Sequence, residues 1–338
     1  MAETPAYDAD PGHAAETPLI FGGVLDGEGG YRPVDWEYVA GWKAGAGEGT
    51  LWLHLDRSHD AAAEWLEQAL DVPDALVTLL TSDETRPRAF VSGDRLLAIM
   101  RGINFNPGAE PEDMIALQFW LQPGLVVTLR HERLQSPRDV LARLEAGEGP
   151  RTCDELLAQM IELMVEKIGL AIFDMNDRID ALEAAEDTTE AEPMLKEISD
   201  IRRDCLSLRR YMSPEHDALL EIVRTAPAWM GENSKLEIRE TADRLKRFLE
   251  DLEVSIESAI VLQDDINSRL AAQASHTMYM LSIVAAIFLP LSFVTGLLGI
   301  NVGGMPGVDS TDASWVTVGL LAMLLGLQLY IFRKLKWL

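Results

Sequence analysis

The chain has 338 residues, of which 48% are hydrophobic, so it can bury more core than one ordinary domain needs. Its 55 acidic residues outnumber the 29 lysines and arginines, and the formal net charge is −26. Such an excess of acid argues against a nucleic-acid-binding protein, which needs cations to neutralise phosphates, and suits a protein that handles cations, although many soluble acidic proteins share it.

The first 150 residues carry the signals of mixed α/β structure. Residues 1–18 are polar and acidic and lack the apolar run of a signal peptide, so we predict a disordered lead-in. Over residues 19–150, "PLIFGGVLDG" and "GTLWLHLD" predict strands, whereas "AAAEWLEQAL" and "DALVTLLTS" predict helices. The turn sequences "SGD" (92–94) and "QPG" (122–124) predict two hairpins. These elements together predict an α+β domain with a mixed sheet flanked by helices.

Strand signals end after Pro150, and residues 151–277 are predicted to be helical because apolar residues recur there at helical spacing. The segment "AAEDTTEAEP" predicts a break between two helices. A further helix is predicted to start with Ser213 as its N-cap and Pro214 in its first position. Cys153 and Cys205 are not part of a CxxC pair, so we expect two buried, reduced thiols rather than a disulfide or a zinc ribbon.

A long stalk helix is predicted to begin near Ser234, because neither proline nor glycine interrupts the chain from there to Tyr279. Largely apolar residues recur every seven positions in two rows, which is coiled-coil spacing and predicts that the stalk packs against partner helices. The two rows are Ile238, Leu245, Leu252, Ala259 and Ile266, and Ala242, Leu249, Ile256, Gln263 and Leu270.

Two apolar runs near the C-terminus, residues 278–298 and 313–332, match the roughly 20 residues that a helix needs to cross a bilayer. Neither run contains a formally charged side chain. Pro290 lies in the middle of the first run and predicts a kink, to which we assign no role beyond shape. Aromatic residues that favour membrane interfaces lie near the ends of both runs: Tyr279, Trp315, Tyr330 and Trp337.

The basic residues predict how the two spans are oriented. Arg333, Lys334 and Lys336 follow the second span in the tail 333–338, whereas the connection 299–312 has no basic residue. The positive-inside rule therefore places the C-terminus in the cytoplasm, and two spans place the N-terminus there as well.

The predicted external loop, residues 299–312, is rich in glycine and holds one asparagine and two acids. The glycines permit tight turns, and Asn301 offers neutral oxygens to a cation without holding it as a carboxylate would. Asp309 and Asp312 would raise the cation concentration at a pore mouth, or they are ordinary solubilising residues, and both alternatives stay open.

One face of the first span carries mostly small and hydroxyl-bearing side chains at steps of 3.5 residues. The simplest explanations are close packing between membrane helices and hydrogen bonds from hydroxyls to the preceding turn. A symmetric ring of copies would instead place this stripe around a shared axis, with Asn301 at its outer end. The stripe consists of Ser275, Met278, Ser282, Ala285, Leu289, Ser292 and Gly296.

Several of these features occur together in one known family. Two C-terminal spans, a Gly-x-Asn tripeptide after the first, a stalk helix before it and the basic tail "FRKLKWL" resemble the CorA family of divalent-metal transporters. The magnesium and cobalt branch typically shows Tyr-Gly-Met-Asn, whereas this chain has Leu298 and Ile300 in place of the tyrosine and the methionine. The run "GINVGGMPG" looks instead like the zinc-associated ZntB branch.

The resemblance implies a homopentameric funnel, with α+β domains in the cytoplasm and five first spans lining a pore. It also implies that the tripeptide Gly299, Ile300 and Asn301 forms an outer ring around a hydrated cation, which suits ions that release water reluctantly. The family's pore-facing positions fall on Ser275, Met278, Ser282, Leu289 and Ser292.

The expected function is uptake of divalent metal across the bacterial inner membrane, with zinc preferred. One alternative is a magnesium, cobalt or nickel channel of the same family; another is a membrane-anchored coiled-coil scaffold or sensor, which would need neither the loop nor the stripe. The sequence has no GxxxxGK[ST] motif, so we do not expect ATP hydrolysis. We expect a transporter and not an enzyme. We expect lipid, divalent cations and further copies of the chain as partners, with no nucleic acid and no resident cofactor.

A second candidate metal site lies in "HLDRSHD", where His54, Asp56 and His59 are metal-ligand types at close spacing. The alternative is a strand end followed by a helix cap, with Ser58 or Asp56 as the capping residue.

Overall fold

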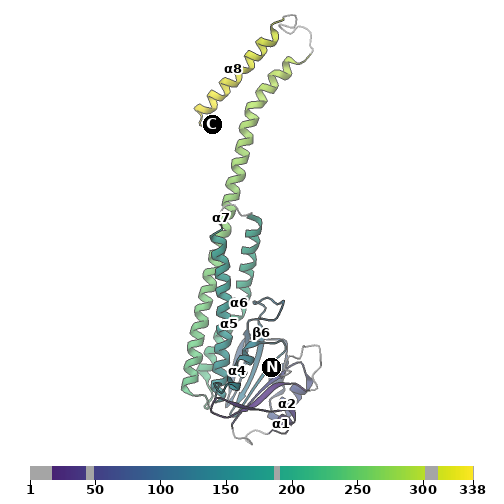
Figure 1. The fold of residues 1–338 in the computed structure, drawn as a ribbon, viewed down its shortest axis with the longest axis vertical. Helices are drawn as coiled ribbons and strands as arrows, with labels where there is room; N and C mark the ends of the chain where they lie inside the picture. Colours follow the sequence, from purple (N-terminus) through teal and green to yellow (C-terminus); the bar gives the residue numbers. More distant parts are fainter. Residues whose placement is uncertain (1–16, 43–48, 186–190, 301–310, 338) are drawn as a thin grey trace, which may run out of the picture. The chain divides into compact units, whose positions relative to one another are not determined.

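The computed structural model describes residues 17–42, 49–185, 191–300 and 311–337. The chain divides into two compact units, one up to Leu262 and one from Gln263 onward. The first unit contains a β-sheet with several helices, and the second contains two apolar helices (Figure 1).

A seven-stranded sheet forms the centre of the first unit, in the order β2-β1-β3-β7-β6-β5-β4. Strands β3 and β7 pair in parallel, and the other neighbouring strands pair antiparallel. The predicted mixed sheet is thereby confirmed. The strands are β1 (Leu19–Leu25), β2 (Tyr31–Pro33), β3 (Thr50–Asp56), β4 (Arg88–Ser92), β5 (Arg95–Gly102), β6 (Ile115–Gln122) and β7 (Leu125–Arg130).

Both predicted hairpins form. Gly93 and Asp94 join β4 to β5, and Pro123 and Gly124 join β6 to β7. Gly93 and Gly124 have φ angles of 59° and 75°, a left-handed backbone that glycine adopts without the steric cost of a Cβ. The turn signals in the sequence therefore mark the positions where the chain reverses.

Helices cover both faces of the sheet. Helices α2 (Asp60–Leu70) and α3 (Asp74–Thr81), both predicted, pack on one face through a cluster that includes Trp120. Helix α4 (Gln135–Glu145) and the longer helices pack on the other face through a larger cluster. The elements α1 (Trp36–Gly41) and β2 were not predicted, because so few residues give no periodic signal.

Three long helices follow: α5 (Cys153–Glu183), α6 (Ala191–Thr225) and α7 (Glu232–Leu298). The break predicted at "AAEDTTEAEP" separates α5 from α6. The predicted helix start at Ser213 is wrong, because α6 runs through it with Pro214 inside the helix. Met212 and Glu215 on either side are buried, so tertiary packing holds the helix together despite the hydrogen bond that proline removes.

The seven-residue rows of the stalk find their partners within the chain. Ile238, Leu245 and Leu252 are fully buried and belong to the cluster that α5 and α6 help to form. Gly169 of α5 lies so near the Phe248 ring of α7 that an added Cβ would come within 2.5 Å of it. The predicted packing of the stalk against partner helices is therefore confirmed in the first unit, with the chain's own helices as partners.

Cys153 and Cys205 are buried and free, as predicted. Burial raises the pKa of Cys153, and it raises the pKa of Cys205 to about 11. Both thiols therefore stay protonated at neutral pH and act as small apolar side chains of the core.

A carboxyl group is buried where α6 meets β5. Glu215 is 1% exposed, and its Oε2 accepts a hydrogen bond from the Arg101 backbone N–H at 3.3 Å. The Arg101 guanidinium lies 4.0 Å from the centre of the Tyr211 ring and donates to the carbonyl oxygens of Thr85 and Met114. Burial raises the pKa of Glu215 to about 8, because the nearby Arg101 only partly offsets the loss of water.

Candidate ion-conducting helix

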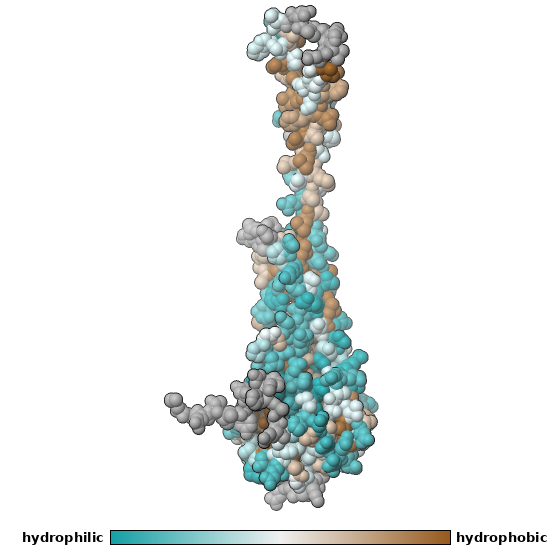
Figure 2. All heavy atoms as spheres, turned by 90° about the vertical axis from the view of Figure 1, so that its right-hand side faces the viewer, coloured by the Kyte–Doolittle hydropathy of each residue, from teal (hydrophilic) through white to brown (hydrophobic). Residues whose placement is uncertain are grey.

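Two helices of the second unit have the length and composition of membrane spans. They are the apolar C-terminal part of α7 and the whole of α8 (Ala313–Lys334). Figure 2 shows hydrophobic side chains, in brown, over the surface of these helices. Leu289 and Met323 expose 70% and 75% of their surface in the single chain. Such exposed apolar side chains are expected to contact lipid or other copies of the protein.

Helix α8 packs along one side of α7 within this unit. Gln328 Nε2 donates to the Ala286 carbonyl at 3.5 Å, and the Tyr279 hydroxyl donates to the Trp337 carbonyl at 2.8 Å. Gln328 was not predicted as a functional residue, although a lone amide in an apolar span is a visible signal in the sequence. Within the two apolar runs, the half-buried residues are, on α7, Ile283, Ala286, Ile287, Pro290, Leu291 and Val294 and, on α8, Ala313, Thr317, Leu321, Leu324, Leu325 and Gln328.

The predicted stripe lies on the other side of α7. At 100° per residue, its centre is roughly 140° around the helix from the centre of the face that contacts α8. All seven stripe residues are exposed in the single chain, and Met278 exposes 65% of its surface. Helix α8 therefore leaves the stripe free for contact with water, ions or another chain.

The stripe includes a hydroxyl that bonds to its own helix. Ser282 donates to the Met278 carbonyl at 2.8 Å, which is the return to the preceding turn considered as an alternative from the sequence. This bond uses the hydroxyl proton and leaves the lone pairs of the oxygen as acceptors. Ser282 can therefore accept hydrogen bonds from the water around a cation while it carries no charge itself.

The outer tripeptide begins directly after α7. The Gly299 N–H donates to the Thr295 carbonyl at 2.9 Å, and an added Cβ on Gly299 would lie 3.2 Å from that oxygen. A larger residue at Gly299 would therefore crowd the end of α7. Ile300 follows with 49% of its surface exposed, whereas Asn301 lies outside the described residues and its role stays a prediction.

Of the two predicted mouth acids, Asp309 lies outside the described residues and Asp312 lies at the start of α8. The Asp312 carbonyl accepts from the Val316 N–H at 3.1 Å, as the first acceptor of the helix. Its exposed position before the first turn of α8 is one that favours a negative charge, because free N–H groups point out of that end of a helix.

The basic tail forms a compact end to α8. The Trp337 N–H donates to the Phe332 carbonyl at 2.8 Å and the Lys336 N–H to the Arg333 carbonyl at 3.3 Å, which is the Schellman pattern. Lys336 adopts the left-handed backbone with φ 56°, and the Trp337 ring stacks on Phe332 at 5.6 Å. Arg333, Lys334 and Lys336 are exposed, so their charges remain in water.

The side chains of His54, Asp56 and His59 have separate structural roles and do not form a metal site. His54 is buried on β3 with Nδ1 2.8 Å from the Thr128 hydroxyl, and burial lowers its pKa well below its ordinary value. Asp56 accepts from the Ser58 backbone N–H at 2.9 Å. His59 is the N-cap of α2, so the suggested caps at Ser58 or Asp56 are wrong. In the part of the chain that the structure describes, no three His, Cys, Asp or Glu side chains gather to hold a metal ion.

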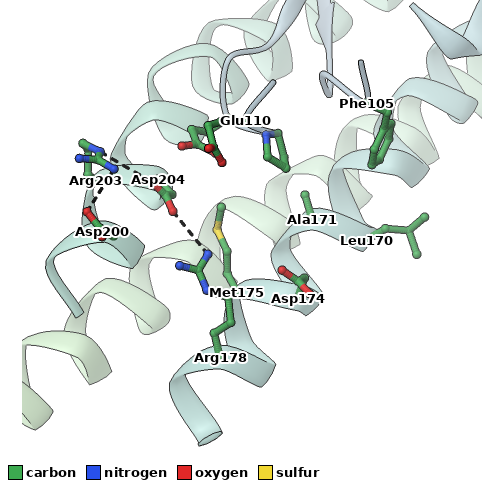
Figure 3. A pocket seen from close by; sticks show the side chains of 12 residues that line it. Phe105, Glu110, Leu170, Ala171, Asp174, Met175, Arg178, Asp200, Arg203 and Asp204 are labelled. Atoms are coloured by element: carbon green, nitrogen blue, oxygen red, sulfur yellow. Dashed lines mark hydrogen bonds and ion pairs between the residues drawn. The ribbon is translucent and has the colours of Figure 1, made fainter. Parts of the chain in front are cut away.

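A cavity of about 560 Å³ in the first unit lies between α5, α6 and the segment before β6 (Figure 3). The arginines on its wall pair with acids: Arg178 lies 3.4 Å from Asp204, which is 3.8 Å from Arg203. Burial and the neighbouring Asp204 raise the pKa of Glu112 on the cavity wall. The arginines already balance the charge of the acids that they contact. We therefore do not assign a metal site to this cavity.

Comparison with known proteins extends over nearly the whole chain. A sequence profile described as "CorA-like Mg2+ transporter protein" matches residues 47–334. The chain is 38% identical over 325 residues to the divalent cation transporter CmaX of Pseudomonas aeruginosa, covering 96% of this chain and 98% of that protein. It is 33% identical over 315 residues to the zinc transport protein ZntB of Pectobacterium atrosepticum, covering 93% and 94%. The structure of full-length CmaX matches with a TM-score of 0.82 at 37% identity, over 96% of this chain and 99% of that one.

These matches include the sheet-bearing unit and both apolar helices, so they confirm the resemblance found in the sequence. They also confirm the predicted fold, an α+β region followed by a long helix and two C-terminal apolar helices. The matched proteins are transporters and not enzymes. The chain belongs to the CorA family of divalent-cation transporters.

Proposed function

We propose that this chain assembles as a homopentamer in the bacterial inner membrane and imports divalent cations, zinc in preference to magnesium. Five copies of α7 line the pore. The observation that carries the proposal is the exposed stripe on α7, which α8 leaves uncovered while it packs on the other side. The basic tail favours the cytoplasmic side, so both termini and the sheet-bearing unit lie in the cytoplasm in this arrangement.

The stripe supplies two kinds of ring to such a pore. Ser275, Ser282 and Ser292 present neutral oxygens, which attract a hydrated cation without trapping it. Met278 and Leu289 present apolar surface, which closes a narrow path when water leaves it. The path therefore alternates between positions that favour a hydrated ion and positions that oppose it.

The outer end of the proposed pore is the ring of Gly299, Ile300 and Asn301, where amide and carbonyl oxygens contact the water shell of the arriving ion. Asp309 and Asp312 raise the cation concentration near this ring. The cation is the cargo, and no resident cofactor is needed. An inside-negative potential of about 100 mV supplies roughly 4.6 kcal/mol for a dication, at about 2.3 per charge, which suffices for uptake.

The ion preference is tested by uptake into liposomes that contain the purified protein. We expect zinc to enter faster than magnesium, cobalt or nickel, because the tripeptide region lacks the tyrosine and methionine of the magnesium branch and the chain resembles a zinc transport protein. Repeating each measurement with and without a pH gradient separates proton-coupled from passive flux. Magnesium uptake equal to or faster than zinc uptake would favour the alternative of a magnesium, cobalt or nickel channel.

Replacing Asn301 with alanine is expected to reduce zinc uptake strongly without preventing assembly, because the outer ring loses its amide oxygens. The matched control is Ser310→Ala, which removes another polar group from the same loop. Uptake and oligomeric size should be measured on the same preparations. Unchanged uptake by the Asn301 variant would count against the outer ring, and unchanged uptake in every pore variant would favour a membrane-anchored scaffold or sensor.

A further inference from the structure

The first span contains a backbone carbonyl that lacks its usual donor from the same helix. Pro290 has no N–H, and in an uninterrupted helix residue 290 would donate to the carbonyl of Ala286. Gln328 of α8 fills this place, since its Nε2 lies 3.5 Å from the Ala286 oxygen. Both Ala286 and Pro290 are on the half-buried face that α8 contacts, so the bond lies between the two helices and away from the stripe.

The cost of this glutamine argues against a role in packing alone. Its Oε1 is buried and, within the described ranges, has no hydrogen-bond partner, which is unfavourable between two apolar helices. Thr317, on the same face of α8, avoids this cost because its hydroxyl donates to the Ala313 carbonyl of its own helix at 2.9 Å. An apolar residue at position 328 would pack without burying an oxygen that lacks a hydrogen-bond donor. The amide N–H of Gln328 is therefore the group that can explain why a glutamine occupies this position.

We propose that Gln328 is a positioning residue for ion conduction: its amide donor replaces the one that Pro290 lacks and so limits how far α7 can bend at the proline. Leu289 and Ser292 flank the proline and belong to the stripe, so their direction depends on this bend. The inference rests on the proposed function of the stripe, and Gln328 is the group that would keep the stripe in position. A helix that bends freely at Pro290 would present these two side chains over a range of directions.

The test is a double-mutant cycle between positions 328 and 290. Gln328→Met keeps the shape of the side chain but has no donor, and Pro290→Ala restores the backbone donor. We expect Gln328→Met to lower zinc uptake by roughly 3- to 18-fold, the range set by measured hydrogen bonds between membrane helices. In the Pro290→Ala background the same change should have little effect, because residue 290 then satisfies Ala286 itself. Thr317→Val is the matched control and should act independently of position 290.

The same cycle should be measured by thermal unfolding of the purified protein in lipid nanodiscs. A coupling between the two positions in the unfolding midpoint demonstrates the hydrogen bond even if no variant transports an ion. Failure of the proposed transport function can therefore be distinguished from failure of the inference about Gln328. If Pro290→Ala does not assemble, Gln328→Glu takes its place: its carboxyl donates when protonated, so acidic pH should restore what Gln328→Met loses. Equal effects of Gln328→Met in both proline backgrounds, or no rescue by the glutamate, would overturn the inference.

Discussion

Replacing Ser282 with leucine is expected to reduce zinc uptake to the level of empty liposomes while the protein still assembles. The change removes a neutral oxygen and adds an apolar side chain to the exposed stripe of every copy, which would narrow and dry the proposed pore. The hydroxyl of Ser282 bonds to the carbonyl of Met278 on its own helix, and α8 packs on the other side, so the contact between the two spans stays intact. Radioactive zinc uptake and the oligomeric size of the same sample provide the measurement.

Val284→Leu is the matched control for Ser282→Leu. Val284 lies two residues further along α7 and is 51% exposed, but it belongs neither to the stripe nor to the face that contacts α8. In the proposed pentamer it faces lipid, where one additional methylene group is tolerated. Uptake should remain near that of the unchanged protein. A similar loss in both variants would place the conducting path elsewhere.

Replacing Glu215 with glutamine is expected to remove a large pH dependence of stability. The pKa of this carboxyl is about 8 in the folded protein and 4.5 in its ordinary environment, so the folded state keeps a proton that the unfolded state releases. The stability associated with this proton is complete below pH 4.5 and is lost as the pH rises through 8. The difference between the two values corresponds to about 5 kcal/mol of unfolding free energy.

Thermal unfolding at several pH values between 5 and about 9 measures this effect. The glutamine oxygen can still accept from the Arg101 N–H, so Glu215→Gln should unfold at a higher temperature than the unchanged protein at alkaline pH. Glu64→Gln is the control, because Glu64 is exposed on α2 and contributes no buried carboxyl group. A pH dependence that persists in Glu215→Gln would show that other groups control the stability in this range.

Local signals in the sequence were sufficient where the neighbouring residues alone determine the backbone. Gly93 and Gly124 mark turns because their left-handed backbone excludes most other residues. The apolar runs of α7 and α8 are long enough to be recognised as candidate membrane spans from the sequence alone. Pro214 shows where this reasoning fails. Its effect on a helix is local, but the helix around it is held by side chains that pack on a distant part of the chain.

The candidate site divides in the same way. The spacing of residues along a helix defines a face, so the stripe was predictable without knowledge of any partner. The side of α7 that α8 covers was not predictable, because Pro290 and Gln328 come together only through the packing of two helices. His54, Asp56 and His59 are close in sequence, but a buried strand position and a helix cap give them separate partners.

The two membrane helices are joined at more than their connecting loop. The hydroxyl of Tyr279 holds the carbonyl of Trp337 at one end, and Gln328 reaches α7 further along. We therefore expect α8 and the apolar part of α7 to move together rather than independently. In the proposed pore, a fluorophore attached to α8 at Met323, which is 75% exposed, would then report any bending of α7 from a position outside the ion path.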